Sequence, residues 1–467
     1  MSKLEDISTL IGSGITPLRS NNLFWNKKEI PWLKTEQLGE FIIYDTNEYI
    51  SKYALDNTPI KLFPKNTISL AMYGEGKTRG NVSILGREMC SNQACCNIVV
   101  NESLADYRYV YYWLKNNYLN LRNLAVGVRK NLNSDDIKKF KIDLKTLPIQ
   151  KQIADLLYCI DSKIQNNNQI NSELESLAKT LYDYWFLQFE FPNEEGKPYK
   201  SSGGKMVYNE QLKKESPEGW EVAKISNLSK LISGYPFKTE NFLDGGKYKI
   251  YTIKNVQDGF IDNVTDNNID FIPKDINKDC VLSYGDLIMS LTGNVGRVGL
   301  VFEENALLNQ RVLKIKPLDG FFNYIYLTFR KNAFKNIMQR IAGGTSQKNL
   351  SPNQVGDYLV VKPNKQILAL FNDKLNGFFD SFINNLRQNQ ELTKLRDFLL
   401  PLLMNGQVTI QDAEKQVKEV IKTTNKTFNT DDEKFNLWLQ NQGIAARGDV
   451  DLQTLREIFD AMDEDDK

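Results

Sequence analysis

The most constraining feature of this sequence is an internal repeat. The triplet Lys130-Asn131-Leu132 recurs as Lys348-Asn349-Leu350, 218 positions later, inside the longer matching segments 129–153 and 347–367. Three further places match at nearly the same offset: 30–38 with 248–256, Gly74 with Gly293, and Asn92-Gln93 with Asn309-Gln310. Matches at one fixed spacing indicate a duplicated structural unit. The sequence therefore predicts a tandem duplication of roughly 215 residues, followed by a tail from about Val408.

Both copies show the same internal order. Short β-branched and aromatic runs broken by Gly, Asn and Asp, such as FIIYD and YKIYTI, predict strands. An aromatic helical stretch, the Lys-Asn-Leu turn and one more strand follow, and a long helix closes each copy. The predicted fold class is therefore α+β, with two strand-rich domains in tandem, each followed by a long α-helix, and a pseudo-twofold relation between the copies.

The two long helices carry matching apolar stripes. In the first, the stripe runs through Ile149, Ile153, Leu156, Ile160, Ile164, Leu174, Leu177 and Leu181, and in the second through Ile367, Phe371, Leu375, Phe378, Phe382, Leu392 and Leu399. Both stripes break at their centres into asparagine, at Asn166, Asn167 and Asn168 and at Asn384, Asn385 and Asn389. A stripe on a helix about 60 Å long needs a second helix to cover it. We expect an antiparallel coiled coil whose central asparagines fix the register; the alternative is that each helix packs only on its own domain.

Composition divides the chain into six segments. They are a first domain (1–147), a first long helix (148–188), a linker rich in Gly, Pro, Ser and charge (189–217), a second domain (218–363), a second long helix (364–406) and a helical and acidic C-terminal extension (407–467). Residues 431–467 hold eleven acidic and four basic side chains, so this tail carries −7 and residues 1–430 carry +8. A mildly basic body favours a polyanionic partner, although a mixed, solvated surface has the same balance.

Several kinds of chemistry are excluded by what the sequence lacks. It contains no histidine, which removes Ser-His-Asp and Cys-His nucleophiles. Its five cysteines lack Cys-x-x-Cys spacing, so buried apolar thiols are favoured over a metal site at Cys90, Cys95 and Cys96. No nuclease, amino-methyltransferase or dinucleotide motif is present, and the final DEDDK is typical of a solvated tail. From the missing residues and motifs we expect a chain that by itself performs no catalysis and binds no cofactor or metal. No run of about 18 apolar residues occurs, so we expect the chain to be cytoplasmic.

The stretch AMYGEGKTRG (71–80) imitates a phosphate-binding loop. The Walker pattern needs glycine where Ala71 stands and a helix after the loop, whereas the following residues GNVSILG predict a strand. The second copy keeps glycines and Arg297 in SLTGNVGRVGLVF but lacks the Lys-Thr pair. We therefore interpret both stretches as glycine-rich hairpin tips that present polar side chains.

Three polar clusters recur at equivalent places in the two copies: the hairpin tip, the Asn-Gln pair and the Lys-Asn-Leu turn. Their candidate DNA-binding residues are Lys77, Arg79, Asn81, Gln93, Arg129, Lys130 and Asn131 in the first copy and Asn294, Arg297, Gln310, Arg311, Ser346, Gln347, Lys348 and Asn349 in the second. Arginine pairs with guanine edges and Asn or Gln with adenine edges in a groove. For each residue alone, a solvated turn is the simpler interpretation.

The sequence resembles the specificity subunit of type I restriction-modification systems. The resemblance covers about residues 1–407 and rests on the twofold repeat, the linker FEFPNEEGKPYKSSGGKMVYNEQLKKESPEGWEV, PIQKQI and PNKQI opening the long helices, and LRDFLLPLLMNGQV closing the second. It implies two target recognition domains that each read half of a gapped double-stranded DNA sequence, on an antiparallel helical coil that sets their spacing. It also implies two methyltransferase (M) subunits around this scaffold and motor-nuclease (R) subunits joined to them. S-adenosylmethionine, ATP and Mg²⁺ would then be used in those partners.

The sequence departs from the family pattern at its ends. The first copy lacks the Pro-Glu-Gly-Trp that opens the second, and the tail from Val408 to Lys467 extends beyond the usual core. Part of this tail, NLWLQNQGIAARGDVDLQTLREIFDAMDEDD, predicts an amphipathic helix pair that either docks a partner subunit or is dispensable. Two rival functions remain open: a duplicated module that reads carbohydrate or peptide, and a metal-dependent nuclease that uses the tail carboxylates.

Overall fold

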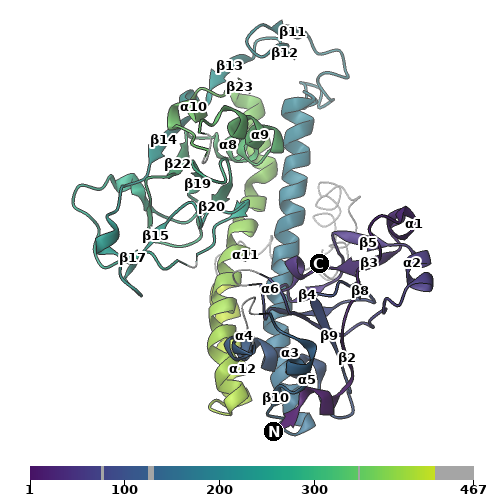
Figure 1. The fold of residues 1–467 in the computed structure, drawn as a ribbon. Helices are drawn as coiled ribbons and strands as arrows, with labels where there is room; N and C mark the ends of the chain where they lie inside the picture. Colours follow the sequence, from purple (N-terminus) through teal and green to yellow (C-terminus); the bar gives the residue numbers. More distant parts are fainter. Residues whose placement is uncertain (75–77, 125–130, 264, 345–347, 426–467) are drawn as a thin grey trace, which may run out of the picture. The chain divides into compact units, whose positions relative to one another are not determined.

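The computed structural model describes residues 1–74, 78–124, 131–263, 265–344 and 348–425, and these form two compact units. The first unit comprises 1–166 with 388–425, and the second comprises 167–387. Each unit contains one strand-rich domain and one half of each long helix (Figure 1). None of the described helices is both long and apolar enough to cross a membrane.

The strand-rich domain of the first unit is built on a five-stranded sheet of order β2-β9-β6-β7-β4, in which only the β4–β7 pair is parallel. A three-stranded sheet, β5-β3-β8, lies beside it, and β1 pairs with β10. The strands are β1 (Ser2–Lys3), β2 (Ser8–Ser13), β3 (Ile30–Leu33), β4 (Ile42–Ile43), β5 (Glu48–Ile50), β6 (Ile68–Ala71), β7 (Val82–Leu85), β8 (Cys90–Ser91), β9 (Cys95–Val100) and β10 (Lys141–Ile142). The short helices are α1 (Asn22–Trp25), α2 (Lys52–Asn57), α3 (Tyr107–Asn116), α4 (Tyr118–Asn123) and α5 (Ser134–Lys138).

The second unit repeats this topology. Its five-stranded sheet has the order β14-β22-β19-β20-β16, again with only the last pair, β16–β20, parallel. Its second sheet is β17-β15-β21-β18, and β13 pairs with β23 as β1 pairs with β10. The strands are β13 (Glu221–Lys224), β14 (Ser229–Ser233), β15 (Tyr248–Tyr251), β16 (Gly259–Phe260), β17 (Asn268–Ile269), β18 (Val281–Leu282), β19 (Leu287–Ser290), β20 (Val298–Leu300), β21 (Ala306–Leu308), β22 (Val312–Pro317) and β23 (Leu359–Lys362). The short helices are α7 (Ile225–Leu228), α8 (Phe322–Phe329), α9 (Asn332–Ile341) and α10 (Pro352–Gly356).

Apart from β18, which adds a fourth strand to the second sheet of the second unit, the strand orders and pairings agree, which confirms the duplication and shows where the first copy begins. Although that copy lacks Pro-Glu-Gly-Trp, β1 opens it in the position that β13 takes in the second copy.

The aromatic helices α3 and α8 form equivalent parts of the two cores. The side chain of Asp106 caps α3 by accepting hydrogen bonds from the backbone N–H groups of Arg108 and Tyr109. The Tyr109 hydroxyl donates to the carbonyl of Asp143 (2.9 Å), and the Tyr324 hydroxyl on α8 donates to that of Val361 (2.5 Å). Each domain is therefore closed by a tyrosine bonded to the backbone near its last strand.

The two long helices are α6 (Leu147–Tyr182), which ends in a π-helical turn (Asp183–Leu187), and α11 (Lys365–Asn405). In the first unit, Asp161 of α6 pairs with Arg396 of α11, and the Asn389 side chain donates to the carbonyl of Ile164 (3.4 Å). Early residues of α6 thus meet late residues of α11, which confirms antiparallel packing within this unit.

The same antiparallel packing holds in the second unit. There the Asn171 side chain donates to the carbonyl of Phe382 (3.1 Å) and accepts from the side chain of Asn385 (2.9 Å). Asn171 is only 5% exposed, so its amide is a buried polar group that needs these bonds. These bonds satisfy the buried amide of Asn171 and require that it lie opposite Phe382 and Asn385, which favours this register.

A further helix, α12 (Ile410–Asn425), follows α11 and packs against it in the first unit. Ala413 and Val417 of α12 lie in the same core as Leu392 and Leu399 of α11. At its far end the buried Thr424 accepts a hydrogen bond from Gln388 (3.0 Å). The start of the predicted extension is therefore an integral helix of this unit, whereas 426–467 lie outside the described residues.

The segment that composition predicted as a linker is folded. It forms a hairpin of β11 (Met206–Asn209) and β12 (Lys214–Pro217). Before the hairpin, Phe191 stacks between Tyr199 and Trp220, with ring centroids 4.7 Å apart in both pairs. Its polar composition reflects an exposed hairpin, and its few aromatic residues supply enough apolar surface to fix it.

Candidate nucleic-acid interface

In the second unit the three predicted polar clusters meet on one surface. The backbone N–H of Leu291, at the end of β19, donates to the carbonyl of Arg311 (3.0 Å), which joins the hairpin tip to the Asn-Gln turn. The N–H of Leu350 donates to the carbonyl of Leu291 (2.8 Å), and that of Gly293 donates to the carbonyl of Lys348 (3.2 Å), which joins the tip to the Lys-Asn-Leu turn. Backbone bonds therefore hold Asn294, Gln310, Arg311, Lys348 and Asn349 next to one another.

The first unit has the same connections. The N–H of Met72 donates to the carbonyl of Ala94 (2.9 Å), and the N–H of Leu132 donates to the carbonyl of Met72 (3.1 Å). These bonds join β6 to the turn that carries Gln93 and to the turn that carries Asn131. As predicted, a strand (β7) and no helix follows the GEGKT stretch.

Two structurally equivalent surfaces, which we call the reading surfaces, are thus built from equivalent loops. Of their predicted residues, Lys77, Arg129, Lys130, Ser346 and Gln347 lie outside the described part of the chain.

The predicted side chains differ in their exposure to solvent. The exposed ones are Gln93, Asn131, Asn294, Gln310, Arg311, Lys348 and Asn349, whereas Arg79, Asn81 and Arg297 are half-buried. Asn81 donates to the carbonyl of Leu38 (3.1 Å), and Arg297 donates to the side chain of Gln257 (2.8 Å). Asn81 and Arg297 therefore also support the loops that carry the more exposed residues.

One loop of the reading surface escaped the sequence prediction. In the first unit it contains Gly14 and Thr16, whose hydroxyl donates to the side chain of Gln93. In the second it contains Gly234 and Tyr235, whose carbonyl accepts from the N–H of Gln310 (3.0 Å). A Cβ on Gly14 would lie 2.1 Å from the carbonyl oxygen of Ser91, and one on Gly234 would lie 2.0 Å from that of Asn309, so only glycine allows this close approach. The signal was present in the sequence, because Ser13-Gly14 recurs as Ser233-Gly234.

A buried ion cluster fixes α3 to both long helices in the first unit. The carboxylate of Asp161 on α6 is 2% exposed and accepts from Arg396 of α11 (2.5 Å) and from the hydroxyl of Tyr112 on α3 (2.9 Å). The ammonium of Lys115 on α3 lies 3.7 Å from the same carboxylate. Burial lowers the pKa of Lys115, and Asp161 partly offsets that effect. The reading surface of this unit is thus carried by a domain that is ion-paired to its helices.

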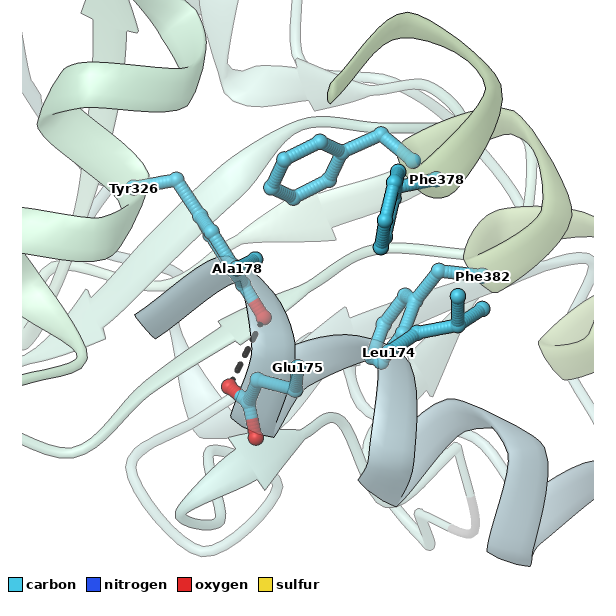
Figure 2. A pocket seen from close by; sticks show the side chains of 7 residues that line it. Leu174, Glu175, Ala178, Tyr326, Phe378 and Phe382 are labelled. Carbon is cyan, nitrogen blue, oxygen red and sulfur yellow. Dashed lines mark hydrogen bonds between the residues drawn. The ribbon is translucent and has the colours of Figure 1, made fainter. Parts of the chain in front are cut away.

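The second unit uses a corresponding cluster, also with an acid from α6. Glu175 accepts from Arg330 (2.5 Å), which follows α8, and from the hydroxyl of Tyr326 (3.1 Å). Figure 2 shows the Tyr326 hydroxyl pointing to Glu175, beside an apolar group formed by Leu174, Phe378 and Phe382. The gap between them is only about 10 Å³, about the size of one water molecule, so it is a packing defect rather than a ligand site.

The cysteines of β8 and β9 are buried in the core, as apolar residues are. Cys90, Cys95 and Cys96 are buried on β8 and β9, and burial raises the pKa of each thiol to about 12. Within the described ranges no group of three or more Cys, Asp or Glu side chains is arranged to hold a metal ion.

Comparison with known proteins gives one consistent family. A family model described as "Type I restriction modification DNA specificity domain" matches residues 1–176 and 217–396. The type I restriction enzyme MjaIX specificity subunit of Methanocaldococcus jannaschii is 28% identical over 427 residues, which cover 88% of this chain and 94% of that protein. The HindI specificity subunit of Haemophilus influenzae is 22% identical over 332 residues, which cover 60% of this chain and 72% of that protein.

A solved structure has the same fold. The type I restriction-modification S subunit from M. genitalium matches with a TM-score of 0.50 and 17% identity, over 86% of this chain and 95% of that one.

Proposed function

Because this chain belongs to the family of type I restriction-modification DNA specificity proteins, its role is DNA sequence specificity, and we propose that each reading surface recognises one half of a bipartite DNA target. The observation that carries this proposal is the duplication of the reading surface. Equivalent turns, joined by equivalent backbone bonds, present exposed amide side chains in both units. A duplicated reader of carbohydrate or peptide has no support from the family match.

The exposed side chains suit contact with base edges and phosphates. Gln93 in the first unit and Gln310 in the second can pair with adenine, and Arg311 can pair with guanine or neutralise a phosphate. The two sets of exposed residues differ, so the two units would read different half-sites.

The long helices would set the distance between the half-sites. At 1.5 Å per residue, the 36 residues of α6 and the 41 of α11 correspond to rods of about 54 Å and about 62 Å. Rods of this length are compatible with half-sites about one DNA turn, or about 34 Å, apart, with unread base pairs between them.

The chemistry of the complex would belong to other subunits. We expect two methyltransferase subunits to dock on the long helices and motor-nuclease subunits to join them in the cytoplasm. Those partners would use S-adenosylmethionine, ATP and Mg²⁺ for methylation, translocation and cleavage. The modest charge of +8 on residues 1–430 fits a chain whose partners share the neutralisation of phosphate.

The decisive experiment is to express the chain with its methyltransferase subunit and map modified adenines across a genome. We expect one gapped sequence with two defined halves. Replacing residues 1–147 by those of another family member should change one half and leave the other intact. A single continuous site, or a change in both halves, would contradict the proposal.

A point substitution tests the reading surface directly. Arg311→Ala should relax one half-site by about 1–3 kcal/mol of discrimination if the side chain makes a bidentate base contact. Arg87→Ala is the matched control, because Arg87 is also exposed but lies at the end of β7 away from the hairpin tip. Unchanged specificity in the Arg311 variant would remove that residue from the reading surface.

A further inference from the structure

The second unit holds an open cavity of about 300 Å³ between the start of α8 and one face of α11. It is lined by Gly320, Phe322, Asn323, Asn372, Leu375, Asn376, Phe379, Asp380 and Ile383. Two phenylalanine rings, several amides and one carboxylate therefore surround the same space. The domain-to-helix packing of the second unit does not fill it.

The internal duplication identifies the corresponding place in the first unit. Two hydrogen bonds between the long helices, from Asn171 to the carbonyl of Phe382 and from Asn389 to that of Ile164, are related by an offset of 218, so Asn376 corresponds to Tyr158. The equivalent tyrosines of α3 and α8, which close the two cores, lie 215 positions apart, so Asn323 corresponds to Arg108.

In the first unit this place is filled by the chain itself. The guanidinium carbon of Arg108 lies 5.5 Å from the ring centre of Tyr158, and the Phe41 ring lies 5.1 Å from that of Tyr158. Arg108 also donates to Asp155 (2.6 Å) and Asp106 (2.8 Å). A guanidinium held by carboxylates and an aromatic face thus occupies the position that is hollow in the second unit.

The second unit lacks the cation and keeps one of its two acceptors, because Asp106 corresponds to Phe321 whereas Asp155 corresponds to Asp373. Asp380, about two helical turns further along α11, lines the cavity. Asp373 and Asp380 are exposed, and neither forms an ion pair with any residue of the described chain. The ring of Phe322 is half-buried and lines the cavity, so it offers apolar surface against which a cation can pack.

We propose that this cavity is a docking site for an arginine side chain of a partner protein in the restriction-modification complex. The guanidinium would replace what Arg108 supplies in the first unit, with its N–H groups donated to Asp380 and to amide oxygens at the wall. Arginine fits better than lysine, because a planar guanidinium both stacks on rings and donates in a fork. A DNA phosphate is disfavoured because the rim is acidic. The inference rests on the proposed function, since it requires a protein partner on the long helices.

The first test measures assembly of the full chain with its methyltransferase subunit. Asn376→Tyr fills the cavity as Tyr158 fills its counterpart, and Asp380→Asn removes the charge without changing shape. We expect each to weaken the complex at least about tenfold in Kd by sedimentation analysis. Glu419→Gln, which removes one charge from an exposed site on α12, is the control and should leave Kd unchanged.

The second test identifies the occupant. Benzoylphenylalanine placed at Ile383 on the rim should cross-link, in the purified complex, to a methyltransferase segment that contains an arginine. Changing that arginine to lysine should weaken assembly as Asp380→Asn does, and the two changes together should weaken it no further than either alone.

The outcomes separate this proposal from the proposed function. If both cavity variants assemble like the unmodified chain, or if Glu419→Gln weakens assembly equally, the docking site is refuted while DNA reading stands. Additive effects of the paired substitutions would also refute it. If the unmodified chain neither binds the methyltransferase subunit nor directs methylation to a bipartite sequence, the proposed function fails, and the docking site fails with it.

Discussion

Asp161→Asn should be one of the most destabilising single substitutions in the first unit. The side chain of Asp161 is 2% exposed and that of Arg396 is 13% exposed, so the pair is largely removed from water. Removing one partner of a buried pair costs about 3–5 kcal/mol, because the other charge stays buried without compensation. Arg396 also contacts Asp397 (2.7 Å), but Asp397 is 58% exposed and its contribution is about 0–1 kcal/mol. We therefore expect a loss of about 3 kcal/mol.

The loss of stability caused by Asp161→Asn should depend on pH in a defined direction. Burial lowers the pKa of Lys115 from its ordinary value of 10.5, and Asp161 opposes this shift. Without the carboxylate, the folded-state pKa falls further, so the folded protein binds fewer protons than the unfolded chain. Stability of the variant should then rise with pH through the folded-state pKa towards 10.5, and the deficit should shrink.

Hydrogen exchange of the α3 amides is the appropriate assay, because a protein of two units need not unfold in one step. Asp397→Asn is the control and should cost less than about 1 kcal/mol. The double substitution Asp161→Leu with Arg396→Met should recover part of the loss, since apolar residues can replace a buried pair. If Asp161→Asn and Asp397→Asn reduce protection of α3 equally, the buried cluster does not fix the domain.

Three further outcomes are expected. Burial raises the pKa of Glu175, but Arg330 and Lys179 outweigh this effect and hold the pKa below 4.5. The resulting stabilisation is present above pH 4.5 and is lost as the pH falls through the folded-state pKa, so Glu175→Gln should remove this pH-dependent loss of stability from the acid unfolding of the second unit. An unaltered acid-unfolding profile would contradict the assignment. Asn171→Ala should destabilise the same unit by about 1–3 kcal/mol through two lost buried hydrogen bonds, measured from denaturant midpoints, and a change below about 0.5 kcal/mol would show that the bonds contribute little. Iodoacetamide at pH 8 should label the exposed Cys159 in the native protein and leave the three buried thiols of β8 and β9 unlabelled. Peptide mass mapping measures this, and labelling of the β8 or β9 cysteines would contradict their burial.

The sequence predicted the features that repeat at a fixed spacing. The offset of 218 between the Lys-Asn-Leu turns identified the tandem copies, and the apolar stripes identified α6 and α11, which pack antiparallel within each unit. The sequence also identified the three polar clusters as turns that recur in both copies, but their meeting on one surface became visible only in the structure. What could not be read from sequence was the pairing of strands, such as the parallel β4–β7 pair, since it joins segments far apart in the chain.

Buried polar residues on the long helices were the main feature that the sequence-based prediction missed. Asp161 and Glu175 were passed over because a search for apolar periodicity treats carboxylates on a helix as solvated. Their burial depends on Arg396 and Arg330, which arrive from other elements, so the pairing exists only in three dimensions. The folded structure of the connector between the copies was not predicted for a related reason. Its composition is mostly polar, but a few aromatic residues pack together and hold it in place.

That folded connector determines how the polypeptide can be divided. Phe189, Phe191 and Trp220 share a core with α8 and the start of α11, so the stretch after α6 is a physical part of the second unit. A protein expressed as two separate pieces should therefore be split directly after the π-helical turn that ends α6, so that Phe189, Phe191 and Trp220 stay together in the C-terminal piece. A break in the exposed turn between β11 and β12 would move Phe189 and Phe191 to the N-terminal piece, strip aromatic cover from the C-terminal piece and leave that piece prone to aggregate.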